Sequence, residues 1–276
     1  MPEITLPLVF GVAVAGAAAG FLGGLLGLGG GVFLVPMLVL GLDLPMRETV
    51  ALSLATVVAT SAAVAAGRAA RLLINLRLGL LLEIATATGG LLGGLSAVFF
   101  GQAALQRIFA AVVIAIAAVT LARLDQRNVS FDDEATPGPW GGRFLDDDSG
   151  LPVTYRVRRM PVALGGSFVA GALATLLGIG GGTVKVPMLT AWCGVPIRAA
   201  AATSALMMGV TAAAGATIYY GRGLLVPSLA AAAILGVQAG AAAGLRVSAH
   251  APVRTLKILM AGMLIIVGLL MLLRSL

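Results

Sequence analysis

The stretch that decides the fold is GFLGGLLGLGGGVFLVPML at residues 20–38, which returns as GALATLLGIGGGTVKVPML at residues 171–189. Both copies read L-L-G-[LI]-G-G-G-x4-P-M-L, at a constant offset of 151 residues. In each copy three consecutive glycines interrupt an apolar run, and each glycine costs a helix about 1 kcal/mol relative to alanine. The glycines therefore predict a place where one helix stops and a second, short helix begins.

The duplication extends beyond this motif. Further positions match between the copies: Pro45 and Pro196, Arg47 and Arg198, Ser53 and Ser204, Gly89 and Gly236, Gly93 and Gly240, and Arg107 and Arg254. Apolar segments follow the order long, short, long, long, long in each copy. We therefore predict two homologous halves, residues 1–124 and 160–276. The polar segment 125–159 between them is interpreted as a solvated tether, with a small regulatory or partner-binding hairpin as the alternative.

Composition places these halves in a membrane. Hydrophobic residues make up 59% of the 276-residue chain and charged residues only 11%, and the mean hydropathy is +1.06. A soluble domain carries about 25% charged residues, and apolar segments of about 20 residues can cross a ~30 Å hydrocarbon core as helices. The prediction is an all-α polytopic membrane protein, with about eight long transmembrane helices and two short re-entrant or half helices after the glycine breaks.

Charge and cysteine content exclude several other classes. The net charge of +7 does not indicate nucleic-acid binding, because Arg and Lys of a membrane protein gather in cytoplasmic loops and set its orientation. The single Cys193 excludes an intramolecular disulfide, and the single His250 cannot anchor a His-based metal site or proton relay alone. No cofactor is expected.

Loop charges predict the topology. Arg68, Arg71 and Arg77 crowd one short loop, and basic residues also flank the linker and the loop at residues 246–257. The positive-inside tendency places all three loops in the cytoplasm, which requires an odd number of crossings in each half. The halves are then inverted, with both termini periplasmic in a bacterial inner membrane. Either the glycine break divides two crossings, or the long and short segments form a re-entrant hairpin, which the shortness of residues 32–42 favours. Eight spans with parallel repeats are the alternative.

The glycine triplets are the candidate substrate-binding backbone: Gly29, Gly30 and Gly31 in the first half, and Gly180, Gly181 and Gly182 in the second. Unwound backbone at membrane depth is tolerated only where it is buried in protein or lines a wet cavity. The helix that follows begins with free N–H groups and the positive end of its dipole, which attract an anion. Inverted halves bring two such breaks face to face. Close helix packing is the alternative for the triplets, and it is the expected role of glycines spaced by four, such as Gly89 and Gly93.

Lys185 is the one lysine within a predicted membrane segment. Intramembrane charges are functional candidates by default, and a cation near a helix N-terminus adds to the attraction for an anion. A snorkelling lysine near an interface is the alternative. Its counterpart Leu34 is apolar, so the predicted site is asymmetric.

Other polar residues in the apolar segments add to this site. Candidate hydroxyl donors are Ser53, Thr203 and Ser204. Glu83 is interpreted as an interface residue paired with Arg77, with proton coupling as the alternative. Predicted interfacial belt residues are Trp192, Tyr219 and Tyr220.

The duplicated motif, together with P-x-R and with A-x-T-S at residues 201–204, resembles the TauE/SafE family of sulfite exporters, also called toluene-sulfonate uptake permeases. The resemblance covers essentially the whole chain, including VTYRVRR at residues 153–159, and Pro36 and Pro187 match the family signature. It implies transport of sulfite, sulfoacetate or related organosulfur anions, although family members are assigned many substrates.

The predicted function is a secondary carrier of a small anion that works by alternating access, with proton or ion coupling as a candidate driving force. An enzyme is not expected, because the chain has no H-E-x-x-H, no G-x-S-x-G and no paired intramembrane carboxylates. The alternatives are an anion channel and a non-transporting scaffold or sensor that acts through residues 125–159.

Overall fold

The structure, a computed structural model, describes residues 5–26, 30–66, 73–122, 138–145, 152–248 and 253–275. The helices of the first half are α1 (Leu6–Leu26), α2 (Gly31–Gly41), α3 (Met46–Ala66), α5 (Leu76–Ser96), the 3-10 turn η1 (Ala97–Phe99) and α6 (Gln102–Ala122). Those of the second half are α7 (Met160–Leu177), α8 (Gly182–Trp192), α9 (Ile197–Gly221), α10 (Pro227–Ser248) and α11 (Val253–Arg274). Within these ranges seven helices are long and apolar enough to cross a membrane, and α11 adds the shorter apolar stretch Ile258–Arg274. The predicted polytopic all-α fold is confirmed.

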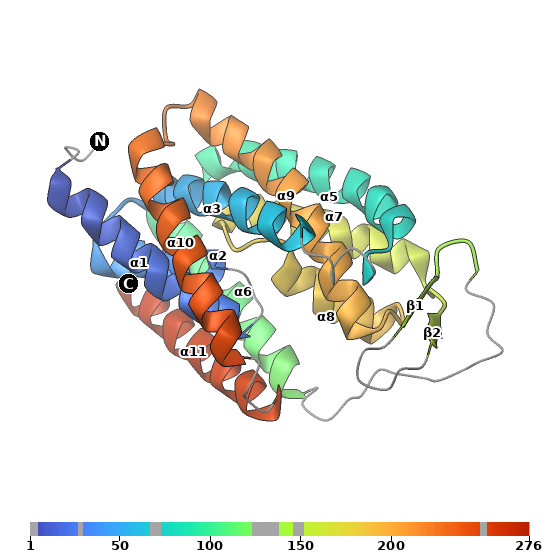
Figure 1. Ribbon diagram of the computed structural model, residues 1–276. Coiled ribbons are helices and arrows are strands. Elements are labelled where there is room, and N and C mark those ends of the chain that lie inside the picture. Colours follow the sequence, from blue (N-terminus) through green and yellow to red (C-terminus); the bar gives the residue numbers. More distant parts are fainter. Residues whose placement is uncertain are drawn as a thin grey trace.

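The two halves are interleaved. α1 of the first half packs along α10 of the second, and α5 of the first half packs along α7 of the second (Figure 1). Glycines make both contacts backbone to backbone. A Cβ at Gly20 would lie 2.2 Å from the carbonyl oxygen of Val237, and one at Gly89 would lie 2.0 Å from that of Phe168. Small residues at a four-residue spacing allow this approach in a membrane. The packing role predicted for these glycines is confirmed.

Equivalent helices of the two halves run in opposite directions where they touch. On α3 and α9, Ser61 donates a hydrogen bond to the carbonyl of Ala205, whereas the earlier residue Leu54 packs against the later residue Gly215. The helices α6 and α11 form the second such pair. Arg107, near the start of α6, donates a hydrogen bond at 3.0 Å to the carbonyl of Ser275, directly after the end of α11. A symmetry axis along the membrane normal would make equivalent helices parallel. The repeats are therefore inverted, and the alternative of parallel repeats is wrong.

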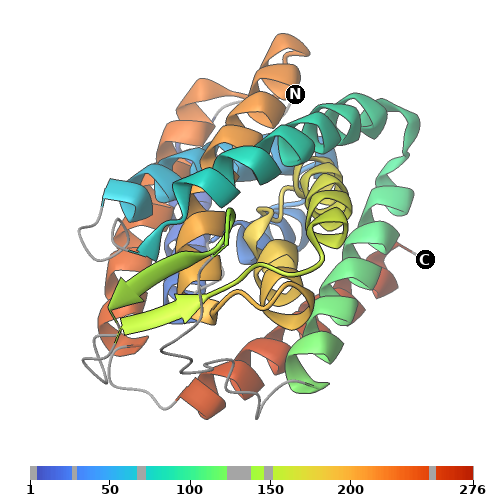
Figure 2. The ribbon, with the colours of Figure 1, turned by 90° about the vertical axis from the view of Figure 1, so that its right-hand side faces the viewer.

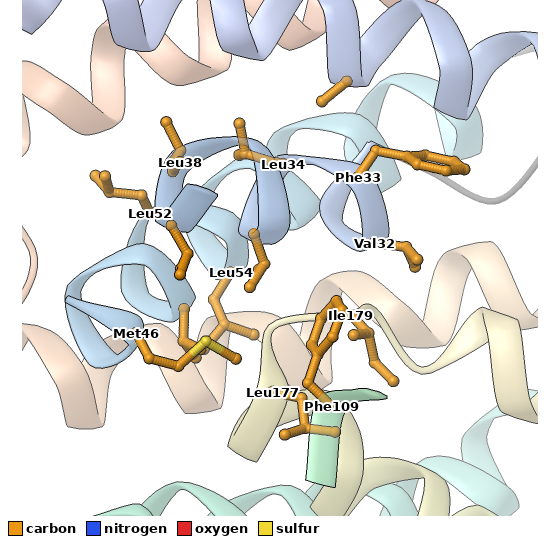
Figure 3. Packing of buried hydrophobic residues seen from close by; sticks show 14 of the residues in the cluster. Val32, Phe33, Leu34, Leu38, Met46, Leu52, Leu54, Phe109, Leu177 and Ile179 are labelled. Carbon is orange, nitrogen blue, oxygen red and sulfur yellow. The ribbon is translucent and has the colours of Figure 1, made fainter. Parts of the chain in front are cut away.

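The short helix α2 turns back along α1. The side chain of Leu42, just after α2, lies 3.1 Å from the position of a Cβ on Gly11, near the start of α1. The 11 residues of α2 span only ~16 Å along the helix axis, about half the thickness of the hydrocarbon core of a membrane. Along α2 most side chains are buried, and they lie among those of α3 with Leu177 and Ile179 of the second half nearby (Figure 3). The segment is thus a half helix inside the protein.

The described part of the linker is an antiparallel hairpin of β1 (Gly142–Leu145) and β2 (Pro152–Tyr155). It crosses the face of the helix bundle shown in Figure 2, at the end opposite the start of α1 and the end of α11 (Figure 1). Phe144, Val153 and Tyr155 are buried against residues of α5, α8 and α9. These helix residues include Leu78, Leu82, Met188, Leu189 and Met207. The interpretation of the linker as a solvated tether is therefore wrong for these residues.

Candidate functional site

The helix breaks fall where the glycines predict them. Helix α7 ends one residue before Gly178, and α8 begins at Gly182. Gly178 and Gly180 both have φ of +70°, a left-handed conformation that side chains with a Cβ rarely adopt. In the first half α2 begins at Gly31, the residue equivalent to Gly182 at the offset of 151 residues. Gly29 lies outside the described residues.

The two breaks touch one another. A Cβ on Gly31, the first residue of α2, would lie 2.8 Å from the carbonyl oxygen of Gly178. Ser53 of α3 links them: its hydroxyl donates to that carbonyl at 2.6 Å and lies 3.4 Å from the carbonyl oxygen of Gly31. The predicted meeting of the breaks is confirmed. The Ser53 proton is engaged in holding them together, so this hydroxyl is not a free donor.

Ser204, the counterpart of Ser53, has a different environment. Its Oγ lies 3.4 Å from the position of a Cβ on Gly182, at the start of α8. The hydroxyl is fully buried, and it has no hydrogen-bond partner in the described part of the chain. A buried hydroxyl without a partner is costly unless another group occasionally satisfies it. Ser204 therefore keeps a donor available beside the second break.

Two predicted site residues belong to other contacts. Thr203 accepts a hydrogen bond from the backbone N–H of Asn75 at 3.0 Å, which holds the start of α5 against α9. Gly30 faces α1 and α10, because a Cβ there would lie 2.8 Å from Val237 Cγ1 and 3.5 Å from Gly20 Cα. Neither residue lies with the group around the second break.

The strongest electrostatic feature is a buried pair formed by Lys185 of α8 and Glu83 of α5. Their Nζ and Oε2 atoms are 3.7 Å apart, and the two residues are 0% and 8% exposed. Thr211 of α9 donates to the other carboxylate oxygen at 2.7 Å. The expected pairing of Glu83 with Arg77 at an interface is wrong, since Arg77 is exposed and the carboxylate faces the protein interior. A snorkelling Lys185 is excluded by the same burial.

Lys185 also ties this pair to the second break. Its side chain turns back over Gly181, where a Cβ would lie 3.2 Å from Lys185 Cε and 3.5 Å from Nζ. The ammonium group therefore lies at the N-terminal end of α8, where the first N–H groups and the helix dipole already favour negative charge. Neither Nζ nor Glu83 Oε2 has a hydrogen-bond partner among the described residues. This end of α8 has no side-chain cap either.

Three buried hydrogen-bonding residues on α7 and α9 near this pair are not singled out by the sequence analysis. Thr211 holds Glu83, Thr175 of α7 donates to the carbonyl of Gly90 at 2.6 Å, and Tyr219 donates to the carbonyl of Thr175 at 3.2 Å. Tyr219 is 1% exposed, so its assignment to the interfacial belt is wrong. Thr211, Gly215 and Tyr219 follow one another at a spacing of four in α9, so this short stripe could have been found in the sequence.

A cavity of about 190 Å³ lies between the hairpin and the start of α5. Its lining includes Asn75, Arg77, Arg143 and Tyr155. Asn75 donates to the Tyr155 hydroxyl at 3.1 Å, and burial raises the pKa of Tyr155, so this phenol stays protonated near neutral pH. Within the described ranges no three His, Cys, Asp or Glu side chains gather to hold a metal ion.

Comparison with known proteins agrees with this architecture. A family model described as "Sulfite exporter TauE/SafE" matches residues 12–271. A protein of Bacillus subtilis (strain 168), described as "Probable membrane transporter protein YunE", is 25% identical over 264 residues, which cover 93% of this chain and 94% of that protein. No solved structure gives a significant match.

Proposed function

Because the chain belongs to the sulfite exporter TauE/SafE family and is a multi-span membrane transporter, we propose that it is a secondary carrier of a small anion. Sulfite and related sulfur-containing or organosulfonate anions are the proposed substrate class. The observation that carries the proposal is the ammonium group of Lys185, fully buried and without a hydrogen-bond partner in the described residues.

The proposed binding site is the N-terminal end of α8. Three kinds of group suited to an oxyanion converge there: backbone N–H groups, the Lys185 ammonium and the Ser204 hydroxyl, which has no partner among the described residues. Gly180, Gly181 and Gly182 have no side chain to keep a ligand from the backbone. The break of the first half contributes Gly31, which touches the second break at the carbonyl of Gly178.

Alternating access follows from the inverted halves in this proposal. Lys185 is inaccessible from either side of the membrane in this conformation, so an anion reaches it only after the helices around it separate. Inverted repeats provide two equivalent ways to separate, one toward each side. We place the linker and the basic loop at residues 68–77 in the cytoplasm of a bacterial cell, with both termini periplasmic, on the positive-inside tendency.

The test compares Lys185→Met with Leu34→Met, its counterpart in the other half. Both variants place methionine at a fully buried position, and a Leu-to-Met change is well tolerated. We expect Lys185→Met to reduce uptake of thiosulfate and sulfonates into proteoliposomes at least about tenfold, because one charge-assisted contact contributes about 1.5–3 kcal/mol. Leu34→Met should retain uptake.

Three outcomes contradict the proposal. Equal uptake in both variants would remove Lys185 from the site. The absence of any anion-dependent thermal shift or uptake in the wild type would remove the anion assignment. Uptake that rises linearly with anion concentration, without saturation, would favour a channel.

A further inference from the structure

Glu83 occupies the place at Lys185 that a bound anion would take. Its Oε2 lies 3.7 Å from the Lys185 ammonium, and Thr211 donates a hydrogen bond to its Oε1. A substrate oxyanion would present the same groups to the protein: a negative oxygen for the ammonium and an acceptor for a hydroxyl. Without substrate, the carboxylate of Glu83 thus serves as the anion at this site.

No other charge lies near this pair in the described helices. α7 contains no charged residue, and α8 contains only Lys185. The neighbouring α9 is charged only near its start, at Arg198, and α5 carries its other charge at Arg77, exposed in its first turn. The net charge of the closed site therefore depends on Lys185, on Glu83 and on whatever binds between them.

We propose that Glu83 is a resident counter-ion, which a substrate anion displaces from Lys185 only when the carboxyl group takes up a proton. One proton then accompanies each monovalent anion across the membrane. This inference rests on the proposed function, since it requires an anion at Lys185.

Charge balance gives the reason for the coupling. In the empty carrier Lys185 and ionised Glu83 cancel, and in the loaded carrier Lys185 and the anion cancel while Glu83 is neutral. An anion bound without a proton leaves one negative charge in the closed site, and a proton without an anion leaves one positive charge. An uncompensated charge in this environment is strongly disfavoured. The carrier therefore closes with both ligands or with neither, which is the condition for symport.

One carboxylate oxygen of Glu83 can take up this proton without breaking a hydrogen bond. Oε1 already accepts from Thr211, whereas Oε2 has no hydrogen-bond partner among the described residues. The proton binds to Oε2, and the new O–H group can donate to an oxygen of the arriving anion. On release of the anion, the proton leaves and Oε2 returns to Lys185.

The test measures anion and proton entry together. Proteoliposomes with the wild-type protein contain a pH-sensitive dye and receive labelled methanesulfonate or ethanesulfonate, both of which are monovalent and carry no proton near neutral pH. We expect the interior to acidify by one proton for each methanesulfonate that enters. If neither anion enters, the proposed function is overturned together with this inference. If an anion enters without acidification, this inference alone is overturned.

Glu83→Gln separates coupling from binding, because glutamine imitates the protonated carboxyl group permanently. Exchange of internal for external anion should continue, since the loaded carrier stays neutral. Net uptake and acidification should fall at least about tenfold, because the empty carrier would retain an uncompensated Lys185. The matched control Glu48→Gln, in the first turn of α3, should behave as the wild type.

Other results with these variants overturn the proposal. Proton-coupled net uptake in Glu83→Gln would do so. Loss of exchange as well as uptake, in a variant with a wild-type thermal midpoint, would assign Glu83 to anion binding instead. If Glu83→Gln does not fold, Glu83→Asp decides: the pH dependence of net uptake should shift, and an unchanged profile contradicts a protonation step at this residue.

Discussion

Where the second glycine break has Lys185 and Glu83, the first has Leu34 and Ala230 at the equivalent positions. The short helices α2 and α8 that follow the two breaks begin at matched residues, and each is 11 residues long. The backbone is thus shared, whereas the charged pair, with one residue from each half, lies at the second break only. The comparison separates two roles. The duplicated helices provide the inverted framework, and residues such as Lys185 and Glu83, which have no charged equivalent in the other half, provide the chemistry.

The largest expected effect comes from moving the charge to the first break. Leu34→Lys places an unpaired ammonium at a fully buried position, and we expect the free energy of unfolding to fall by about 3–5 kcal/mol. Adding Ala230→Glu, at the position equivalent to Glu83, should recover part of this loss. Denaturation in detergent measures both variants. If Leu34→Lys alone lowers the free energy of unfolding by less than about 1 kcal/mol, the first break tolerates a buried charge and the two breaks do not differ in this respect.

An intermediate effect tests the backbone of the break. Gly178 has φ of +70°, and a Cβ there would lie 3.1 Å from Val50 Cα. Gly178→Ala should therefore lower the free energy of unfolding by about 1–3 kcal/mol. The matched control is Gly165→Ala inside α7, where a Cβ meets open space and alanine should be neutral or stabilising by up to about 1 kcal/mol. Similar thermal midpoints in the two variants would contradict a conformational requirement at Gly178.

The smallest effect distinguishes the two equivalent serines. Ser53→Ala removes the hydrogen bond that links the breaks and should cost about 1–3 kcal/mol, because the buried carbonyl of Gly178 loses its donor. Ser204→Ala removes a hydroxyl that has no partner among the described residues, so the free energy of unfolding should change by less than about 0.5 kcal/mol. Equal costs at both positions would assign the two hydroxyls the same structural role.

The sequence predicts the scaffold well because its signals are patterns in the residues themselves. The glycine triplets and the lengths of the short segments are read from neighbouring positions and locate α2 and α8, and their recurrence after 151 residues identifies the two halves. Lys185 is likewise visible from the sequence, because any charge within an apolar run is conspicuous.

The partners of Lys185 are not predictable in the same way. Glu83 reaches it from α5, and Thr211 of α9 in turn holds Glu83. The register between packed helices depends on tertiary contacts that no local pattern encodes. The expectation for Glu83 failed because its nearest basic residue in the sequence, Arg77, lies on an exposed part of α5. A hairpin was only the alternative for the linker, and its packing was missed for a related reason: two four-residue strands in a polar segment gain their stability from contacts with α5, α8 and α9.

The interleaving of the two halves has a consequence for biosynthesis. α1 leaves the ribosome well before α10, but its glycine face packs on α10, and the helices between them are made in the interval. Its partner does not exist while the intervening helices are inserted, so α1 must wait in the membrane with its glycine face turned to lipid or to the insertion machinery. By contrast, α5 waits only until α7 has emerged. The contact between α1 and α10 therefore forms late in the assembly of this transporter, and a chain truncated before α10 leaves that face without its partner.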